Sequence, residues 1–191
     1  VNVVLPGMTG ATGTATFTAN TTLPNGNTDG NVGNDGSTSN VSIYNTALPL
    51  PFTEDFETNG FVNQNWTIGN PDNDFTWEIQ PIVGTAPGSN AARLNFYDYA
   101  QQGQRDGMTT VPISFAGYTS VTMTFEHAYR RYNQTLTDSL IILVSTDCGQ
   151  TYSRVFAGGE DGTGSFATAA TTTTAFIPAA TAEWCMGTVG A

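Results

Sequence analysis

Three carboxylates stand close together in the short segment Glu54-Asp55-Phe56-Glu57. In an extended strand, Asp55 and Glu57 share one face, and Phe56 lies on the other, where it would point into a core. Carboxylates crowded at a sheet edge repel one another, and a hard cation bound by oxygen ligands neutralises them. Asp138 opens an apolar run and could supply a further ligand. We therefore expect a structural Ca²⁺ site formed by Glu57, Asp138 and Asp55; the alternative is a solvated acidic strand.

The loop Asn70-Pro71-Asp72-Asn73-Asp74 is a second candidate for Ca²⁺ binding. The carboxylates of Asp72 and Asp74, with backbone carbonyls of a tight loop, are suitable calcium ligands. Asp and Asn are equally common in ordinary turns, which is the alternative. Residues 25–30 have the early spacing of an EF-hand loop. Gly36 stands where that motif needs a bidentate Glu, so an EF-hand is excluded.

Aromatic and polar side chains are interspersed in residues 97–104, which we interpret as the best candidate for a ligand-binding loop. The apolar faces of sugars stack on exposed aromatic rings much as nucleic-acid bases do. Charged neighbours can hydrogen-bond to the sugar hydroxyl groups. For each aromatic residue the alternative is packing in the core. The candidate ligand-binding residues are Tyr97, Asp98, Tyr99, Arg130 and Tyr132.

The sequence offers little for catalysis. His127 is the only histidine, and it alternates with apolar residues, so we expect it to lie in the core rather than in a catalytic triad. Neither a Gly-x-Ser-x-Gly elbow nor a phosphate-binding loop occurs. Acidic residues are numerous enough for a glycosidase pair, but nothing singles out two of them. We expect a protein that is not an enzyme and has no catalytic residue.

The 191 residues include 16 acidic and five basic ones, giving a formal charge of −11. Such a charge repels nucleic acids and anionic membranes, and it suits divalent cations and solubility outside the cell. No apolar stretch is long enough for a membrane span, so membrane insertion is not expected. Cys148 and Cys185 could pair with each other or with cysteines elsewhere, and only geometry decides between these alternatives.

Thr, Gly and Asn are abundant, which favours many short strands joined by tight turns. Residues 121–127 alternate apolar and polar side chains, as a half-buried strand does. The unbroken apolar run at 140–144 predicts a central strand buried on both faces, with 151–156 as its hairpin partner. Glu183-Trp184-Cys185 is also typical of the middle of a strand. Further strands are expected at 1–5, 11–19, 41–44, 91–97, 108–115 and 171–176.

These elements predict an all-β protein of two blocks. Residues 1–47 are too few to bury a core and are interpreted as the C-terminal part of an Ig-like β domain. Residues 48–51 contain two prolines and form a stiff linker. Residues 52–191 are expected to form an antiparallel two-sheet sandwich, a jelly roll. Strand-like sequence at both ends leads us to expect a piece of a longer chain.

Six motifs follow one another in the second block: Pro51-Phe52-Thr53-Glu54-Asp55-Phe56-Glu57, Asn65-Trp66-Thr67-Ile68, Asp74-Phe75-Thr76-Trp77, Phe125-Glu126-His127-Ala128-Tyr129, Asp138-Ser139-Leu140 and Val144-Ser145-Thr146-Asp147-Cys148-Gly149. With these motifs in this order, the block resembles the MAM-like jelly-roll modules called choice-of-anchor J and cleaved-adhesin domains. Tyr152 stands where that family usually has Trp after the Cys-Gly pair.

The resemblance implies a secreted or cell-surface protein of Bacteroidetes, exported by the type 9 secretion route. Family members similarly hold structural calcium with acidic residues of the opening strand. They act as adhesins, carbohydrate-binding modules or accessory domains of secreted peptidases. The expected partners are therefore glycans, host or matrix proteins, and neighbouring domains of the same chain. The alternatives are a structural spacer in a surface fibre or filament and an accessory domain of a metallopeptidase.

Overall fold

The computed structural model describes residues 13–23, 26–44, 46–58, 60–61, 65–82, 88–133, 135–136, 138–159 and 166–190. This part of the chain consists of strands and loops, with helix limited to short 3₁₀ turns. Every strand pair in it is antiparallel. The prediction of an all-β protein is therefore confirmed. The chain divides into two compact units, Val1–Leu48 and Pro49–Ala191, which are described separately.

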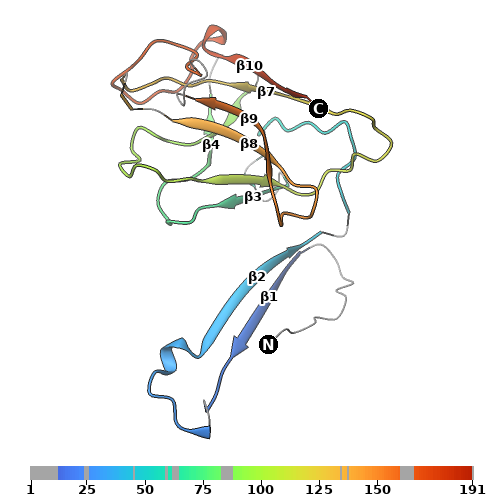
Figure 1. Cartoon of the computed structure of the whole chain (residues 1–191). Coiled ribbons are helices and arrows are strands. Elements are labelled where there is room, and N and C mark those ends of the chain that lie inside the picture. Colours follow the sequence, from blue (N-terminus) through green and yellow to red (C-terminus); the bar gives the residue numbers. More distant parts are fainter. Residues whose placement is uncertain are drawn as a thin grey trace. The chain divides into compact units, whose positions relative to one another are not determined.

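The first unit is built on a hairpin of β1 (Gly13–Asn20) and β2 (Gly36–Ile43), joined through the 3₁₀ turn η2 (Val32–Asn34) (Figure 1). β1 matches the strand predicted at 11–19. β2 begins earlier than the strand predicted at 41–44. The prediction missed its first five residues, Gly-Ser-Thr-Ser-Asn, because they contain no apolar side chain. Pairing with β1 makes this polar segment a strand. The segment predicted at 1–5 lies outside the described residues.

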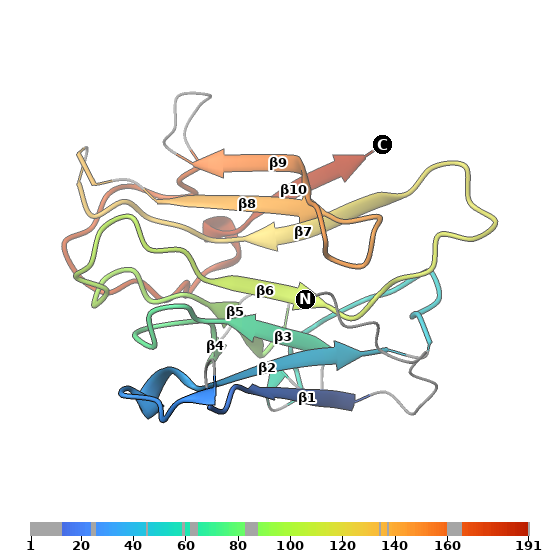
Figure 2. The same ribbon diagram turned by 60° about the horizontal axis from the view of Figure 1, so that its bottom comes forward.

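The described residues of the second unit form eight short strands in four antiparallel pairs. Figures 1 and 2 place β7, β8, β9 and β10 on one side of this unit and β3 on the other. The buried hydrophobic residues of the described chain, Phe61, Ile82 and Tyr129, all belong to this unit. The pairs are β3 (Trp66–Gly69) with β6 (Gly107–Thr110), β4 (Glu78–Pro81) with β5 (Asn90–Arg93), β7 (Thr122–His127) with β10 (Cys185–Gly190), and β8 (Ser139–Val144) with β9 (Ser153–Gly159).

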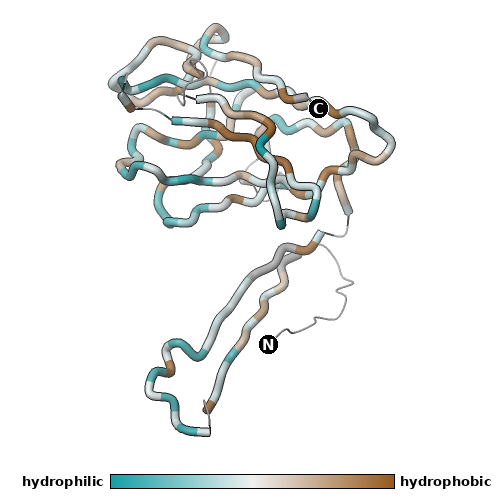
Figure 3. The backbone as a smooth tube through the Cα atoms, in the orientation of Figure 1, coloured by the Kyte–Doolittle hydropathy of each residue, from teal (hydrophilic) through white to brown (hydrophobic). Residues whose placement is uncertain are grey.

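β8 is hydrophobic along most of its length, as Figure 3 shows, and it pairs with the predicted hairpin partner. Its expected burial on both faces is wrong. Leu140 and Ile142 are half-buried, whereas Ile141 is 39% exposed and Leu143 is 50% exposed. One face of the strand packs inward and the other remains open. A continuous apolar run could not distinguish these two arrangements, because alternation is visible only when polar residues mark the open face.

Two further predictions about strands are corrected. Residues 171–176 form no strand; their threonines bond locally instead, with Thr174 N donating to Thr172 Oγ1 at 3.3 Å. Such side-chain bonds compete with the strand ladder for backbone groups. Near the end of the chain, the 3₁₀ turn η4 (Thr181–Glu183) precedes β10, so Cys185 begins a strand rather than lying within one. None of the helices in the described residues could cross a membrane.

Aromatic rings from separate elements fill the space beside β7. Phe125 packs edge-to-face on Phe156 of β9, with ring centroids 5.2 Å apart. His127 stacks on Phe166 at 4.2 Å with nearly parallel planes. Gly187 of β10 lies opposite Phe125, and a Cβ atom there would collide with the Phe125 ring. A residue without a side chain is therefore required where β10 crosses this cluster.

Gly187→Ala should destabilise the protein by about 1–3 kcal/mol, because the added methyl group overpacks the Phe125 ring. The measurement is urea unfolding followed by tryptophan fluorescence. Gly107→Ala is the control, since a Cβ at that strand position meets nothing within 4 Å. Equal effects of the two substitutions would contradict the packing argument.

Candidate functional site

The acidic segment that opens the second unit is irregular rather than a strand. Phe56 has a left-handed backbone, with φ of 57°, and its ring lies 6.1 Å from that of Trp66. Burial nevertheless alternates as expected: Glu54 and Phe56 are half-buried, and Asp55 and Glu57 are exposed. Glu54 accepts hydrogen bonds from Trp66 Nε1 and from the Phe56 amide, both at 2.9 Å. Its carboxylate therefore fixes the turn and the indole together.

The Glu57 carboxylate is occupied by groups of the protein itself. Its Oε1 accepts the amides of Ser89 at 2.6 Å and Asn90 at 3.1 Å, and its Oε2 accepts Asn90 Nδ2 at 3.2 Å. Gly88 leaves the space for this carboxylate, because a Cβ atom there would clash with Oε1. Glu57 thus ties the opening segment to the start of β5. Asp55 accepts the Glu57 amide at 3.1 Å in a local turn.

Asp138 lies just before β8 and accepts the Tyr129 hydroxyl at 3.0 Å. Burial raises the pKa of this carboxyl above its ordinary value, with the hydrogen bond from Tyr129 opposing the shift. Within the described part of the chain, His, Cys, Asp and Glu form no group of three or more that could hold a metal ion. Glu57, Asp138 and Asp55 therefore do not make up such a group.

The loop at 70–74 is held by its own side chains and by Tyr99. Asn70 Nδ2 donates to the Asp74 carbonyl at 2.9 Å, and the Asp74 amide donates to Asp72 Oδ1 at 3.2 Å. The Tyr99 hydroxyl lies 2.6 Å from Asp72 Oδ2 and 3.2 Å from Asp106 Oδ2. Asp106, which the sequence did not single out, thus joins the two predicted residues Asp72 and Tyr99.

A single hydroxyl proton cannot serve both of these carboxylates. The shorter distance assigns the proton to Asp72, whose pKa is lowered by this hydrogen bond. The pKa of Tyr99 is raised, first by its bond to Asp72 and then by burial and the charge of Asp106. In addition, Asp106 Oδ1 and Asn70 Oδ1 are buried oxygens without a hydrogen-bond partner. We call Tyr99, Asp72 and Asp106, together with Asn70 of the same loop as Asp72, the oxygen cluster.

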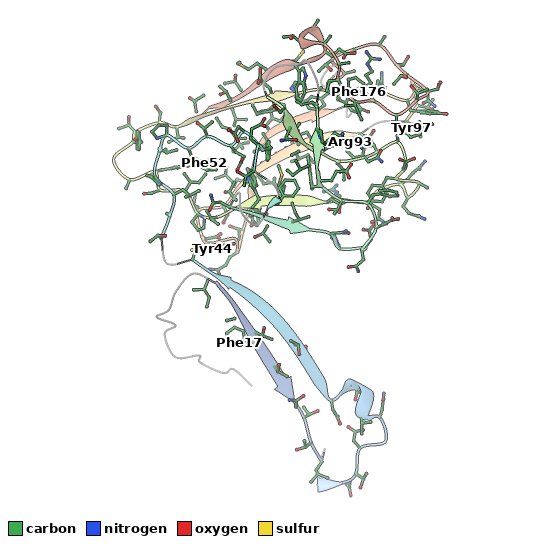
Figure 4. The ribbon with its side chains drawn as sticks, turned by 180° about the vertical axis from the view of Figure 1, so that it is seen from behind. Phe17, Tyr44, Phe52, Arg93, Tyr97 and Phe176 are labelled. Atoms are coloured by element: carbon green, nitrogen blue, oxygen red, sulfur yellow. The ribbon has the colours of Figure 1, made fainter. Side chains whose placement is uncertain are left out.

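Two of the predicted ligand-binding tyrosines meet at the surface. Tyr97 is 50% exposed and Tyr132 is 45% exposed, and their ring centroids lie 6.3 Å apart with planes inclined at 47°. Figure 4 shows Tyr97 at the margin of its unit. Asp98, next to Tyr97, is exposed and accepts Asn95 Nδ2 at 2.8 Å. We call Tyr97 and Tyr132 the tyrosine pair.

The two other predicted ligand residues have different surroundings. Tyr99 is half-buried, with its ring 6.0 Å from that of Phe75 and its hydroxyl in the oxygen cluster. The Arg130 guanidinium forms an ion pair with Glu183 and lies 4.6 Å above the Phe176 ring. Glu183 also accepts the amides of Ala179 and Ala180, at 2.7 and 3.1 Å. Tyr99 and Arg130 therefore hold loops in place.

His127 is half-buried between aromatic rings, and its Nδ1 is buried without a hydrogen-bond partner. Burial lowers its pKa, which favours the neutral ring that stacks on Phe166. Cys148 and Cys185 are both exposed and form no disulfide. Neither cysteine nor the histidine is part of a group that could hold a metal in the described chain.

The chain matches no family model, no curated protein and no solved structure in comparisons with known proteins. Its candidate function therefore depends on the geometry of the oxygen cluster and the tyrosine pair.

Asp147 organises the turn between β8 and β9. Its Oδ1 lies 2.8 Å from Ser145 Oγ and accepts the Thr151 amide at 2.9 Å, and its Oδ2 accepts Thr151 Oγ1 at 2.6 Å. These bonds, with those to Thr151 first, lower the pKa of Asp147 from 3.8 to about 2. Cys148 and Gly149 both have positive φ in this turn. The side-chain bonds therefore hold a backbone conformation that residues other than glycine, such as cysteine, rarely adopt.

Because the pKa of Asp147 is depressed in the folded state, its stabilising effect is complete above about pH 4. That effect is lost as the pH falls from about 4 towards 2. Asp147→Asn should therefore lower the melting temperature at neutral pH and flatten its dependence on pH in this window. Thermal melts at neutral pH and between about pH 4 and pH 2 measure both effects. Glu126→Gln, at an exposed position of β7, is the control. An unchanged slope in Asp147→Asn would refute this role.

Proposed function

We propose that this protein is a non-catalytic, extracellular adhesion and carbohydrate-binding module with a jelly-roll fold, of the choice-of-anchor J or cleaved-adhesin type. The tyrosine pair is the observation that carries this proposal. Two large rings at adjacent surface positions offer apolar area that the protein's own core leaves uncovered. Tyrosine is suited to this role because it combines a rigid apolar ring with a polar hydroxyl group.

Two loops keep the tyrosine pair in place before any ligand binds. Asn95 bonds to Asp98 across the turn that carries Tyr97. Asn133 Oδ1 accepts the amides of Thr135 and Leu136 at 2.8 and 2.9 Å immediately after Tyr132. A binding surface ordered in advance loses less conformational entropy on association. These bonds therefore favour a recognition surface over two rings left exposed by chance.

The proposed fold is supported by antiparallel strand pairs on two sides of the second unit. β10 contacts β9 as well as pairing with β7, so the β7–β10 and β8–β9 pairs lie side by side. Joined in this way, they would form one face of the sandwich, with β3–β6 and β4–β5 contributing to the other. The open face of β8 is compatible with an outer strand face of a sandwich.

We further propose that the module is stabilised by Ca²⁺ at the oxygen cluster. Two carboxylates face one hydroxyl there, and two buried oxygens have no partner. Buried polar atoms without partners are rare in folded proteins, and an ion is one of the groups that satisfies them. Asp72, Asp106 and the Asn70 side-chain oxygen are ligands of the kind that Ca²⁺ prefers. Glu57 fits less well, because three donors already occupy its carboxylate.

Excess CaCl₂ should raise the melting temperature relative to EGTA, because a ligand bound only by the folded state stabilises it by about 2.7 kcal/mol at 100 times its Kd. Asp72→Asn and Asp106→Asn should each reduce the shift, whereas Glu126→Gln, at an exposed position of β7, should retain it. Mg²⁺ should act more weakly, since it requires a smaller and more regular oxygen shell.

No shift in the wild-type protein would overturn the calcium proposal. A calcium-induced rise in melting temperature that survives both cluster substitutions but disappears in Asp138→Asn would instead favour the site first predicted from the sequence, formed by Glu57, Asp138 and Asp55.

A glycan array probed with the whole chain should show binding that Tyr97→Ala/Tyr132→Ala removes. Tyr152→Ala is the matched control, because this tyrosine is also 50% exposed but stands outside the tyrosine pair. Absence of binding to any glycan at high protein concentration would overturn the carbohydrate-binding proposal. That result would favour a spacer in a surface fibre.

A further inference from the structure

The surroundings of the tyrosine pair restrict the kind of glycan it can bind. We propose that its ligand is a soluble, uncharged glycan chain, bound with successive sugar units on the two rings. This inference rests on the proposed carbohydrate-binding function and adds the chemical class of the ligand.

Charge is the first restriction. An anionic sugar is recognised through a cationic side chain. Arg130 is the arginine among the ligand-binding residues predicted from the sequence. Its guanidinium is neutralised by Glu183 and covered on one side by the Phe176 ring. Arg131 is half-buried and has interactions of its own. Of the two charged residues next to the rings in sequence, Arg131 and Asp98, the exposed one is therefore Asp98, a carboxylate.

The carboxylate of Asp98 repels uronates, sulfates and sialic acids, and it can accept hydrogen bonds from neutral sugar hydroxyls. The whole chain reinforces this selection with its formal charge of −11. An uncharged glycan meets no such repulsion. It retains both the stacking on the rings and the hydrogen bonds to the polar groups beside them.

Ring geometry is the second restriction. The planes of Tyr97 and Tyr132 are inclined at 47°, so the two rings do not form one flat surface. A crystalline polysaccharide presents a flat face and could lie on only one of these rings. In a single chain, successive sugar units are rotated relative to each other, so each unit can stack on its own ring. The centroid separation of 6.3 Å is suitable for two neighbouring units.

Isothermal titration calorimetry can test this class with three groups of probes. The neutral soluble group comprises β-glucan, xylan, mannan and galactan. Its anionic counterparts are polygalacturonate, alginate and heparin. Microcrystalline cellulose, measured by sedimentation, supplies the flat insoluble surface.

We expect at least one neutral soluble chain to bind, with an affinity that does not change with added salt. Binding to the anionic group and to cellulose should be at least tenfold weaker, a difference of about 1.4 kcal/mol. Tyr97→Ala and Tyr132→Ala should each weaken binding at least tenfold. Tyr97→Phe, which keeps the ring, should bind within about threefold of the wild type, and Tyr152→Ala should bind normally.

Tighter binding of an anionic glycan or of cellulose would overturn this inference while leaving the carbohydrate-binding function intact. So would neutral-glycan binding that survives both alanine substitutions. Binding of no glycan at all would overturn the carbohydrate-binding function itself, and this inference with it. Circular dichroism of each variant shows whether a loss of binding reflects a loss of folding, and Tyr97→Phe supplies the second variant in that case.

Discussion

Backbone amides that no neighbouring strand can satisfy are the constraint on which the second unit depends. Its strands are short and pair two by two, so long loops carry many N–H groups that need acceptors. Carboxylates supply them: Glu57 accepts two amides at the start of β5, Glu183 accepts two before η4, and Asp147 accepts the Thr151 amide. The acidity of the chain thus has a structural role in addition to any role in solubility.

The same use of charge shapes the surface available for binding. The sequence predicts Arg130 as a ligand-binding residue, but in the structure its guanidinium is paired with Glu183 and stabilises the fold instead. The tyrosine pair remains at the surface with an acidic neighbour, and the oxygen cluster lies at the other end of the short segment 97–99. Tyr99 belongs to the cluster and Tyr97 to the pair. Order in one loop therefore supports both proposed sites.

The sequence predicted structure correctly where apolar and polar side chains alternate. It did not predict features that depend on contacts between residues far apart in the chain. Alternation at 121–127 located β7, and composition predicted the all-β class. β2 was recognised only in part, because its polar first half becomes a strand through pairing with β1. Asp106 could not be found, since it is joined to Asp72 only through the Tyr99 hydroxyl, and Asp72 lies 27 residues before Tyr99. Its place directly before the β6 glycine, after several polar residues, was the one available signal.

The carboxylate-held turns differ in how far they reach along the chain, and this difference affects how the protein can evolve. Every partner of Asp147 lies within four residues, so the turn is a self-contained unit that could be transplanted or flanked by insertions. Glu57 instead joins segments separated by 32 and 33 residues. The Asn90 side chain supplies one of its bonds and Gly88 leaves the space for its carboxylate, so Glu57, Gly88 and Asn90 are expected to vary together.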